Sequence, residues 1–224
     1  MLNDERVEAL LEKYIKANTV VSLGTGPTNE SFLKKLALYS LSNNLRLQVV
    51  PTSHTMALLC SQLKMPTASL EDVEVDLAFD FVDQVDEDFN YISNETTSLI
   101  RDKMIAQDAA EMVVICEEKD FVPRLNAPMC VEISTFSPKK TIAQLMNLGD
   151  PILRQAKGKP VMSETGHYFV DLKFDEIYEL EDIDYQAKKI PGVLETSLFL
   201  GYADRVVLHG STLVVKSRLT NVDA

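Results

Sequence analysis

The sequence predicts an α/β protein: a parallel, doubly wound sheet followed by a smaller α+β domain of ferredoxin-like topology. Three observations support this. In the first half of the chain, short apolar segments alternate with longer segments of helical periodicity. The first apolar segment ends in the turn "GTGPT" and leads directly into a helical segment, which is typical of an α/β unit. In the second half, the order of predicted elements becomes β-α-β-β-α-β, the order of a ferredoxin-like split unit.

The first half begins with a helix and continues as strand–helix pairs. Residues 2–17 place apolar side chains near helical period, and Asn3 or Asp4 can cap this helix. The strand "TVVSL" then leads through "GTGPT" into the helix "NESFLKKLALYS". The strands "RLQVVP", "VDLAFD" and "MVVIC" follow, separated by the helices "TSHTMALLCSQL" and "SLIRDKMIAQDAA". Short apolar strands separated by helices indicate a parallel sheet that is covered on both faces.

The second half predicts the smaller domain. Its expected strands are "MCVEIS", "ILRQ", "HYFVDLKF" and "VLETSLF", and its expected helices are "PKKTIAQLMNLG", which stops at Gly149, and "DIDYQAKKI". The tail "RVVLHGSTLVVKS" predicts two strands that return to the first sheet. The sequence therefore predicts a large domain made of residues 1–126 and 201–224, which holds the active-site cleft, and a small domain spanning 127–200.

Composition and charge exclude several classes of partner. Of the 224 residues, 46% are hydrophobic and 25% are charged, as in an ordinary globular protein, and no apolar stretch is long enough to span a membrane. The formal net charge of −12 argues against nucleic acid and anionic membranes as partners, because both attract a positive surface. The odd number of cysteines and the N-terminus, which lacks a signal-peptide pattern, predict a location in the reducing cytoplasm.

An ordered series of short segments runs along nearly the whole chain. They are "GTGPT" at 24–28, "VVPTS" at 49–53, "VDLAFDFVDQVD" at 75–86, "IRDKMIA" at 100–106, "MVVICEEKD" at 112–120, "APMCVEIS" at 127–134, "ETGHYFVD" at 164–171 and "IPGVLETSLF" at 190–199. This series resembles the type A ribose-5-phosphate isomerases. The resemblance implies a Rossmann-like domain with a ferredoxin-like domain, no metal or other cofactor, and a homo-oligomer, either a dimer or a tetramer. It also implies interconversion of ribose 5-phosphate and ribulose 5-phosphate.

The turn "GTGPT" is a candidate anion site. Glycines at a strand end let the backbone approach an anion, and the helix that follows offers free N–H groups. In the family this loop reads Gly-Thr-Gly-Ser-Thr and holds the sugar phosphate. Thr25, Gly26 and Thr28 match that pattern, whereas Pro27 replaces its serine. The alternative is a tight turn that binds no ligand. His54, beside the same pocket, is a candidate acid or base, or a residue with a capping or packing role.

The acidic segment "DFVDQVD" is the second candidate. The family pattern is Asp-Gly-Ala-Asp-Glu, and Asp80 and Asp83 stand at its two aspartates. Bulky side chains at 81–82 replace Gly-Ala, and Gln84 replaces the glutamate. Two alternatives to a catalytic role are a solvated acidic loop and a divalent cation held by Asp80, Asp83 and Asp86.

The segment "YISNETTSLIRDKMIA" carries the largest departures from the family. There the pattern is Ile-Lys-Gly-Gly-Gly, followed by a helix beginning Arg-Glu-Lys. Aligned without a gap, the lysine falls on Ser93, the glycines fall on 94–96, and the catalytic glutamate falls on Asp102. Ser93 is neutral and cannot replace a cation. Lys119 matches a family lysine after the fourth strand and is the best remaining cation for the pocket.

The chemistry of aldose–ketose isomerisation explains why these positions matter. A carboxylate must move a proton between C2 and C1, and a positive group or strong donor must stabilise the enediolate, which is often worth about 3 to 4 kcal/mol. The resemblance implies Asp102 as the base, with Asp80 and Asp83 orienting or protonating sugar oxygens. The predicted substrate-binding residues are Thr25, Gly26, Thr28, Ser93 and Lys119. The alternative hypothesis is a relative that has lost the reaction and serves as a sugar-phosphate-binding or regulatory protein.

Overall fold

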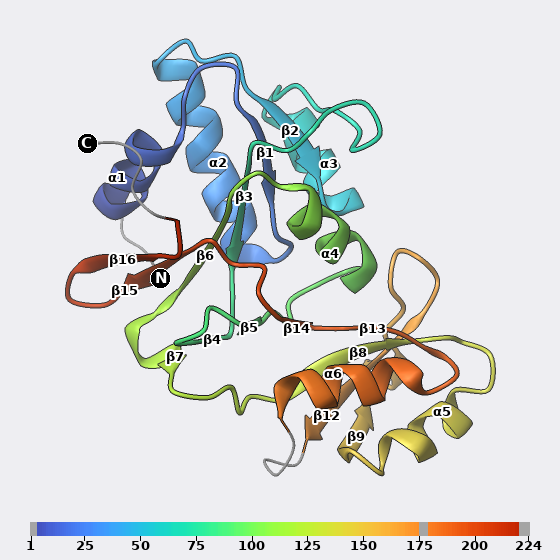
Figure 1. The fold of residues 1–224 in the computed structure, drawn as a ribbon. Helices are drawn as coiled ribbons and strands as arrows, with labels where there is room; N and C mark the ends of the chain where they lie inside the picture. Colours follow the sequence, from blue (N-terminus) through green and yellow to red (C-terminus); the bar gives the residue numbers. More distant parts are fainter. Residues whose placement is uncertain (1–3, 175–178, 220–224) are drawn as a thin grey trace.

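The computed structural model describes residues 4–174 and 179–219, and its largest unit is a six-stranded sheet in the order β16-β15-β6-β3-β1-β2 (Figure 1). The strands from β2 to β15 run parallel, and β16 pairs with β15 in the antiparallel direction. The strands are β1 (Val20–Leu23), β2 (Gln48–Pro51), β3 (Leu77–Phe81), β6 (Met112–Glu117), β15 (Arg205–His209) and β16 (Leu213–Ser217). The predicted return of the tail to the first sheet is confirmed.

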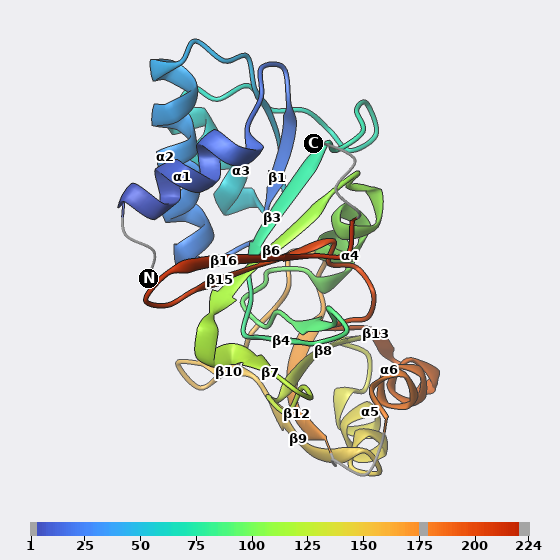
Figure 2. The same cartoon turned by 60° about the vertical axis from the view of Figure 1, so that its left-hand side comes forward.

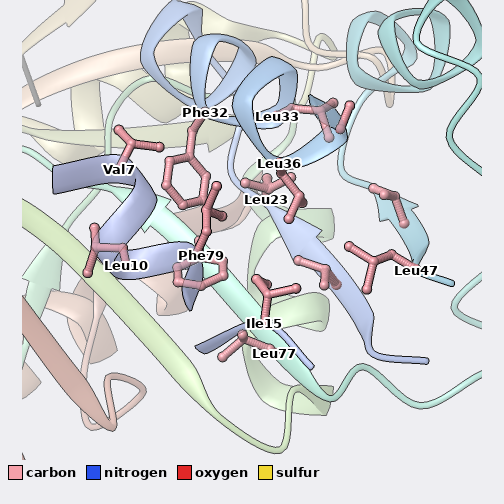
Figure 3. Close-up of a cluster of buried hydrophobic side chains, with 14 of the residues drawn as sticks. Val7, Leu10, Ile15, Leu23, Phe32, Leu33, Leu36, Leu47, Leu77 and Phe79 are labelled. Carbon is pink, nitrogen blue, oxygen red and sulfur yellow. The ribbon is translucent and has the colours of Figure 1, made fainter. Parts of the chain in front are cut away.

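Helices cover both faces of this sheet (Figure 2). On one face lie α1 (Asp4–Tyr14), α2 (Pro27–Ser42) and α3 (His54–Gln62). On the other face lies α4 (Leu99–Asp108). Figure 3 shows the hydrophobic core between this sheet and the helices α1, α2 and α3. In this core, Phe32 of α2 packs on Phe79 of β3 with ring centroids 5.2 Å apart. Burial of each side chain of this size stabilises the folded state by about 1.5 to 3 kcal/mol. This core therefore fixes the position of β3, the strand that carries the candidate site.

The second unit is a four-stranded antiparallel sheet in the order β13-β8-β12-β9. In chain order its elements are β8 (Met129–Ile133), α5 (Pro138–Leu145), β9 (Gly149–Leu153), β12 (Tyr168–Phe174), α6 (Leu180–Lys189) and β13 (Val193–Thr196). This is the predicted β-α-β-β-α-β order, and the fold class is confirmed. A short hairpin of β10 (Gln155–Ala156) and β11 (Lys159–Pro160) lies between β9 and β12.

A third sheet, which the sequence analysis did not predict, has the order β14-β5-β4-β7. Its strands are β4 (Gln84–Asp86), β5 (Tyr91–Ile92), β7 (Phe121–Val122), which follows the short 3-10 helix η1 (Glu118–Asp120), and β14 (Leu198–Phe199). The single strand predicted at 193–199 is wrong, because it divides into β13 and β14, which pair in different sheets. The predicted domain boundaries remain a prediction, and β14, inside the range 127–200, pairs with β5 of the other unit.

Within the described residues, none of the helices combines the length and the apolar character that crossing a bilayer requires. The three cysteines, Cys60, Cys116 and Cys130, are all buried free thiols. Burial raises the pKa of the Cys60 thiol to about 11 and those of the other two to about 12. These thiols therefore serve as small apolar side chains of the core.

Candidate active site

The candidate site lies where the parallel strands β1 and β3 end side by side, at the carboxyl edge of the sheet. Ligands bind at this edge in open α/β sheets. The backbone N–H of Gly24, directly after β1, donates to the carbonyl of Phe79 at 2.8 Å. A Cβ at position 24 would lie 1.9 Å from Oδ1 of Asp80, so only glycine lets the loop pass this carboxyl group. The turn "GTGPT" and the acidic segment are thus brought into contact.

Asp80 is buried near the end of β3 and accepts two side-chain hydrogen bonds. Its Oδ2 accepts from Oγ of Ser93 at 2.7 Å, and its Oδ1 accepts from Nδ2 of Asn29 at 3.0 Å. Burial raises the pKa of Asp80 to about 7, and these two donors only partly oppose that effect. Ser93 therefore supplies a dipole, and its one hydroxyl hydrogen is already used by Asp80.

Asp102 lies in the first turn of α4, a helix whose N-terminal cap is Ser98. The hydroxyl of Thr96 donates to its Oδ2, whereas its Oδ1 is buried and has no hydrogen-bond partner in the described chain. Burial raises the pKa of Asp102 to about 8, and the carboxyl groups of Asp80 and Glu132 add to the rise. The predicted base is therefore present and stays protonated up to an unusually high pH.

Asp80 and Asp102 line one small cavity of about 20 Å³, together with Gly24, Thr52, Tyr91 and Phe199. Tyr91 stacks on Phe199 with ring centroids 4.5 Å apart, and its buried hydroxyl also lacks a hydrogen-bond partner within the described residues. A cavity of this volume has room for about one water molecule. The structure thus brings together the two carboxyl groups that sequence reasoning placed in the site.

Asp83 is the most exposed of the three candidate carboxyl groups. It accepts a 2.7 Å hydrogen bond from the backbone N–H of Asn94. Partial burial raises its pKa, and the Asn94 amide and the positive charge of Arg154 act in the opposite direction. Arg154 belongs to the small unit, where it forms an ion pair with Asp171 and donates to the Asn94 carbonyl at 3.1 Å. Asp83 therefore holds the loop that follows β5 in place.

That loop is fixed on both sides of Glu95. Asn94 donates through Nδ2 to the carbonyl of Pro128 at 2.9 Å, and its Oδ1 accepts from the hydroxyl of Ser197 at 2.7 Å. Thr96 is held by Asp102 and, through its own N–H, by the Asn94 carbonyl at 3.1 Å. The polar stretch "SNETT" is thus an ordered wall of the site.

The "GTGPT" turn forms the opposite wall. The hydroxyls of Thr25 and Thr52 lie 3.2 Å apart, and Thr52 donates to the carbonyl of Leu23 at 2.9 Å. The Thr25 hydroxyl therefore donates to Thr52. Gly26, with φ of 109°, is the N-terminal cap of α2, and Glu95 lies directly over it: a Cβ at position 26 would be 2.4 Å from Cδ of Glu95. Glu95 therefore occupies the space in front of this turn.

Two predicted binding residues lie outside this cluster. Thr28 lines a separate hollow of about 100 Å³ with Phe32, Lys35 and Phe81. Lys119 is in η1, where 73% of its side chain is exposed and its ammonium group forms a 2.7 Å ion pair with Glu117. Their roles in binding stay predictions, and neither residue lines the cavity shared by Asp80 and Asp102.

The small unit holds α4, and with it Asp102, by buried polar contacts. Lys103, only 6% exposed, forms a 2.8 Å ion pair with Glu195. Glu132, which is fully buried, accepts from the N–H of Leu99 at 2.9 Å. Arg101 pairs with Glu164 of the loop before β12 at 2.6 Å. Because these contacts join the first turn of α4 to the small unit, the position of the carboxyl group of Asp102 depends on both units.

The remaining sequence candidates have local partners. Ser53 caps α3, accepting from the N–H of Met56 at 3.1 Å, and the N–H of His54 donates to both oxygens of Glu164 at 2.9 Å. Asp86 accepts from the N–H of Asn90 at 2.9 Å and so stabilises the turn between β4 and β5. The described residues contain no group of three or more histidine, cysteine, aspartate or glutamate side chains placed to hold a metal ion.

Sequence reasoning missed Asn29, Tyr91, Thr96 and Arg154. Asn29 lies on the first turn of α2 and Tyr91 on a strand of two residues, so no periodicity marked either side chain. Arg154 comes from the small unit and reaches the loop across 60 positions of sequence. Only the polar character of "SNETT" pointed to Thr96.

Comparison with known proteins identifies the family. The model of the family described as ribose 5-phosphate isomerase A (phosphoriboisomerase A) matches residues 48–212. The chain belongs to this family. The resemblance stated from the sequence is therefore confirmed, and so is the prediction of an isomerase.

Relatives and solved structures extend over most of the chain. It is 33% identical to the ribose-5-phosphate isomerase A of Sinorhizobium fredii, over 88% of this chain and 89% of that protein. For that of Methanothermobacter thermautotrophicus the identity is 32%, over 84% and 85%. A D-ribose-5-phosphate isomerase in complex with phospho-erythronic acid superimposes with a TM-score of 0.88 at 29% identity, covering 97% of this chain and all of that one. The corresponding enzyme of Methanocaldococcus jannaschii has a TM-score of 0.85 at 26% identity, over 96% of this chain and all of that one.

Proposed function

We propose that this protein interconverts ribose 5-phosphate and ribulose 5-phosphate, or a closely related pair of sugar phosphates, with Asp102 as the proton-transferring base. The observation that carries the proposal is the pair of buried carboxyl groups, Asp80 and Asp102, which line one cavity beside the "GTGPT" turn. Family membership supports the substrate class, and a structural neighbour binds phospho-erythronic acid, an acidic sugar phosphate.

The reaction needs one ionised carboxyl group and one that carries a proton. Oδ2 of Asp102 meets the substrate when the Thr96 hydroxyl turns away from it, because Oδ1 is buried and has no hydrogen-bond partner among the described residues. As the carboxylate takes the proton from C2, the C–H electrons form the C1–C2 double bond and the C1 carbonyl electrons move to O1. A proton passes from O2 to O1 with Asp80 as the orienting acid. The electrons on O2 then form the C2 carbonyl, and the electrons of the C1–C2 double bond take the proton of Asp102 at C1, which gives the ketose.

Burial places both carboxyl groups in the range where such exchange is efficient. The pKa values of about 7 for Asp80 and about 8 for Asp102 lie close to a working pH near neutrality. Asp83 would hold the loop and reach a more distant hydroxyl, because its carboxyl group is exposed. Thr25 and Gly26, with Thr28, Ser93 and Lys119, complete the proposed binding set.

Neither of the two predicted donors, Ser93 and Lys119, offers a free charge to stabilise the enediolate. The Ser93 hydroxyl is engaged by Asp80, and the Lys119 ammonium by Glu117. Removing one such donor from an enzyme typically costs about 10²- to 10³-fold in rate. We therefore expect turnover that is slower by about this factor than that of a site with an ammonium group at position 93.

The test is to incubate the protein with ribose 5-phosphate and follow ketose formation. Asp102→Asn should abolish turnover, and Asp182→Asn, the same change at an exposed position of α6, should leave it unaltered. Turnover that survives Asp102→Asn would refute the assignment of the base. In heavy water, exchange of the proton on Asp102 with solvent should place deuterium at C1 of the ketose. This label is a second readout that does not depend on the rate of turnover.

The second candidate is a sugar-phosphate-binding or regulatory protein that does not catalyse the reaction. It is favoured by the engaged hydroxyl of Ser93 and by the position of Glu95 over Gly26. Thermal stabilisation by ribose 5-phosphate without ketose formation would support this role.

We also propose a homo-oligomer in a reducing cytoplasm that binds no nucleic acid and no membrane. Large apolar side chains are exposed on the small unit, with Phe136 87% and Ile152 68% exposed, and the net charge is −12. Light scattering after gel filtration should give a mass above the monomer's 25.1 kDa. A monomer at micromolar concentration would contradict this part of the proposal.

A further inference from the structure

We propose that Glu95 is the specificity-determining residue of the phosphate end of the site: its carboxylate fills the "GTGPT" turn, so that a phosphate enters only by displacing it. This inference rests on the proposed function, in which the turn receives the sugar phosphate. It concerns a residue that stands where the family pattern has a glycine, and therefore a property of this chain.

The side chain of Glu95 packs against the α-carbon of Gly26. A Cβ at position 26 would be 2.4 Å from Cδ and 2.5 Å from Oε2 of Glu95. Gly26 caps α2, whose first N–H groups are the natural partners of an anion, and Pro27 removes one of them. The space over the α-carbon of Gly26, at the start of α2, is therefore occupied by a side chain that carries the same sign of charge as a phosphate.

The main chain around Glu95 is held, but its side chain is not. Asn94 is bonded to Pro128 and Ser197, and Thr96 is bonded to Asp102. In contrast, Glu95 is exposed, and its carboxylate makes no hydrogen bond or ion pair within the part of the chain that the structure describes. Rotation of its side-chain torsions into solvent therefore clears the turn without disturbing the loop, and this rotation is the displacement that a phosphate has to drive.

The charges that face Glu95 from the surrounding elements are also negative. Partial burial raises the pKa of its carboxyl group most, and the charges of Asp83, which follows β3, and Glu30, on α2, raise it further. Because a unit charge 4 Å away in water weakens binding by about 5-fold for each charge on a phosphate, the penalty for a dianion is roughly 10- to 30-fold. A neutral end group on the substrate carries no such penalty.

The test compares Glu95→Gln, which keeps the size and removes the charge, with Glu95→Ala, which removes both. Calorimetric titration with ribose 5-phosphate, inorganic phosphate and ribose is carried out on each. We expect Glu95→Gln to tighten binding of the two phosphates by roughly 10- to 30-fold and to leave ribose within about 2-fold. KM for the sugar phosphate should fall by the same factor, with kcat little changed. Glu87→Gln, at an exposed position in the β4–β5 turn, is the matched control.

The outcomes separate this inference from the proposed function. Tighter phosphate binding by Glu95→Gln in a protein without turnover supports the role of Glu95 and refutes the isomerase. Turnover with phosphate affinities that Glu95→Gln and Glu95→Ala leave unchanged overturns the role of Glu95 and keeps the isomerase. An equal gain for ribose, or no phosphate binding by any variant, also overturns the inference, since the carboxylate would then not be competing for an anion site.

Discussion

Asp102→Asn should stabilise the protein, and the gain should grow as the pH rises. The structure gives the reason: Asp102 lines a small cavity with Asp80, burial disfavours its charged form, and among the described residues Thr96 alone donates to its carboxyl group. Asparagine keeps the shape and can still accept that hydrogen bond, but it never ionises. A functional carboxylate would then be present at a measurable cost in stability, as is common for active sites.

The sign and size of this change in the free energy of unfolding follow from the pKa values of Asp102 in the folded and unfolded states. The pKa of Asp102 is 3.8 without the fold and about 8 within it, so the native state holds its proton over a range in which the unfolded chain has lost it. The resulting stability is fully present below pH 3.8 and is lost as the pH rises through about 8. The slope is about 1.4 kcal/mol per pH unit. Between pH 6 and 8 the free energy of unfolding of the variant should therefore rise by about 2 to 3 kcal/mol relative to that of the wild type.

The assay is thermal unfolding of both proteins at several pH values from 5 to 9. For a chain of this length, 1 kcal/mol corresponds to about 2 to 4 °C in Tm, so the difference in Tm should widen by roughly 5 to 10 °C between pH 6 and 8. It should then level off above pH 9. Asp182→Asn, on the exposed surface of α6, controls for the chemical change itself. A Tm difference that does not vary with pH would mean that the carboxyl group of Asp102 is ionised and solvated, which would refute the reasoning.

Three further predictions concern charged groups in the site and the ion pair that joins α4 to the small unit. Ser93→Lys combined with Asp102→Glu should raise turnover at least about 10-fold, measured by ketose formation, because an ammonium group stabilises the enediolate; no gain would show that the pocket cannot use it. The two carboxyl groups of Asp80 and Asp102 titrate as a coupled pair, so kcat/KM should be maximal between about pH 7 and 8 and fall on both sides; a flat profile from pH 5 to 9 would contradict this. Lys103→Met removes a buried partner of Glu195 and should cost about 2 to 4 kcal/mol in urea unfolding, and a neutral effect would show that the ion pair contributes little.

Much of the fold could be predicted because its signals are local. The strands of the six-stranded sheet are short apolar runs that end in turn residues, and the ferredoxin-like order depends on the sequence of elements alone. The sheet of β4, β5, β7 and β14 gave no such signal, since its strands have only two or three residues. Propensity and periodicity need longer segments than these, and pairing between β5 and β14 is decided by packing of Tyr91 on Phe199.

The location of the site could be predicted better than the contacts of its side chains. The carboxyl ends of adjacent parallel strands meet, so the contact between the "GTGPT" turn and Asp80 follows once the structure shows that β1 pairs with β3. That Glu95 lies over Gly26, or that Oδ1 of Asp102 is buried without a hydrogen-bond partner among the described residues, depends on side-chain torsions and on a loop anchored from the small unit. Such distances arise from contacts between distant parts of the chain, which no single segment encodes.

The serine at position 93 bears directly on the protonation of the carboxyl pair, because its hydroxyl donates to Asp80. An ammonium group within hydrogen-bond distance of Asp80 would hold the pKa of that carboxyl group low. A serine hydroxyl at 2.7 Å lowers it too, but by less than burial raises it, which leaves the pKa of Asp80 at about 7. Because Asp102 keeps its proton up to about pH 8, the two groups line one small cavity without both being charged below that pH. With a serine at position 93, burial therefore leaves both carboxyl groups with raised pKa values, and Asp102, whose pKa is the higher, keeps its proton to the higher pH. Such a site keeps the two carboxyl groups on which the proposed isomerisation depends, with a neutral hydroxyl beside them.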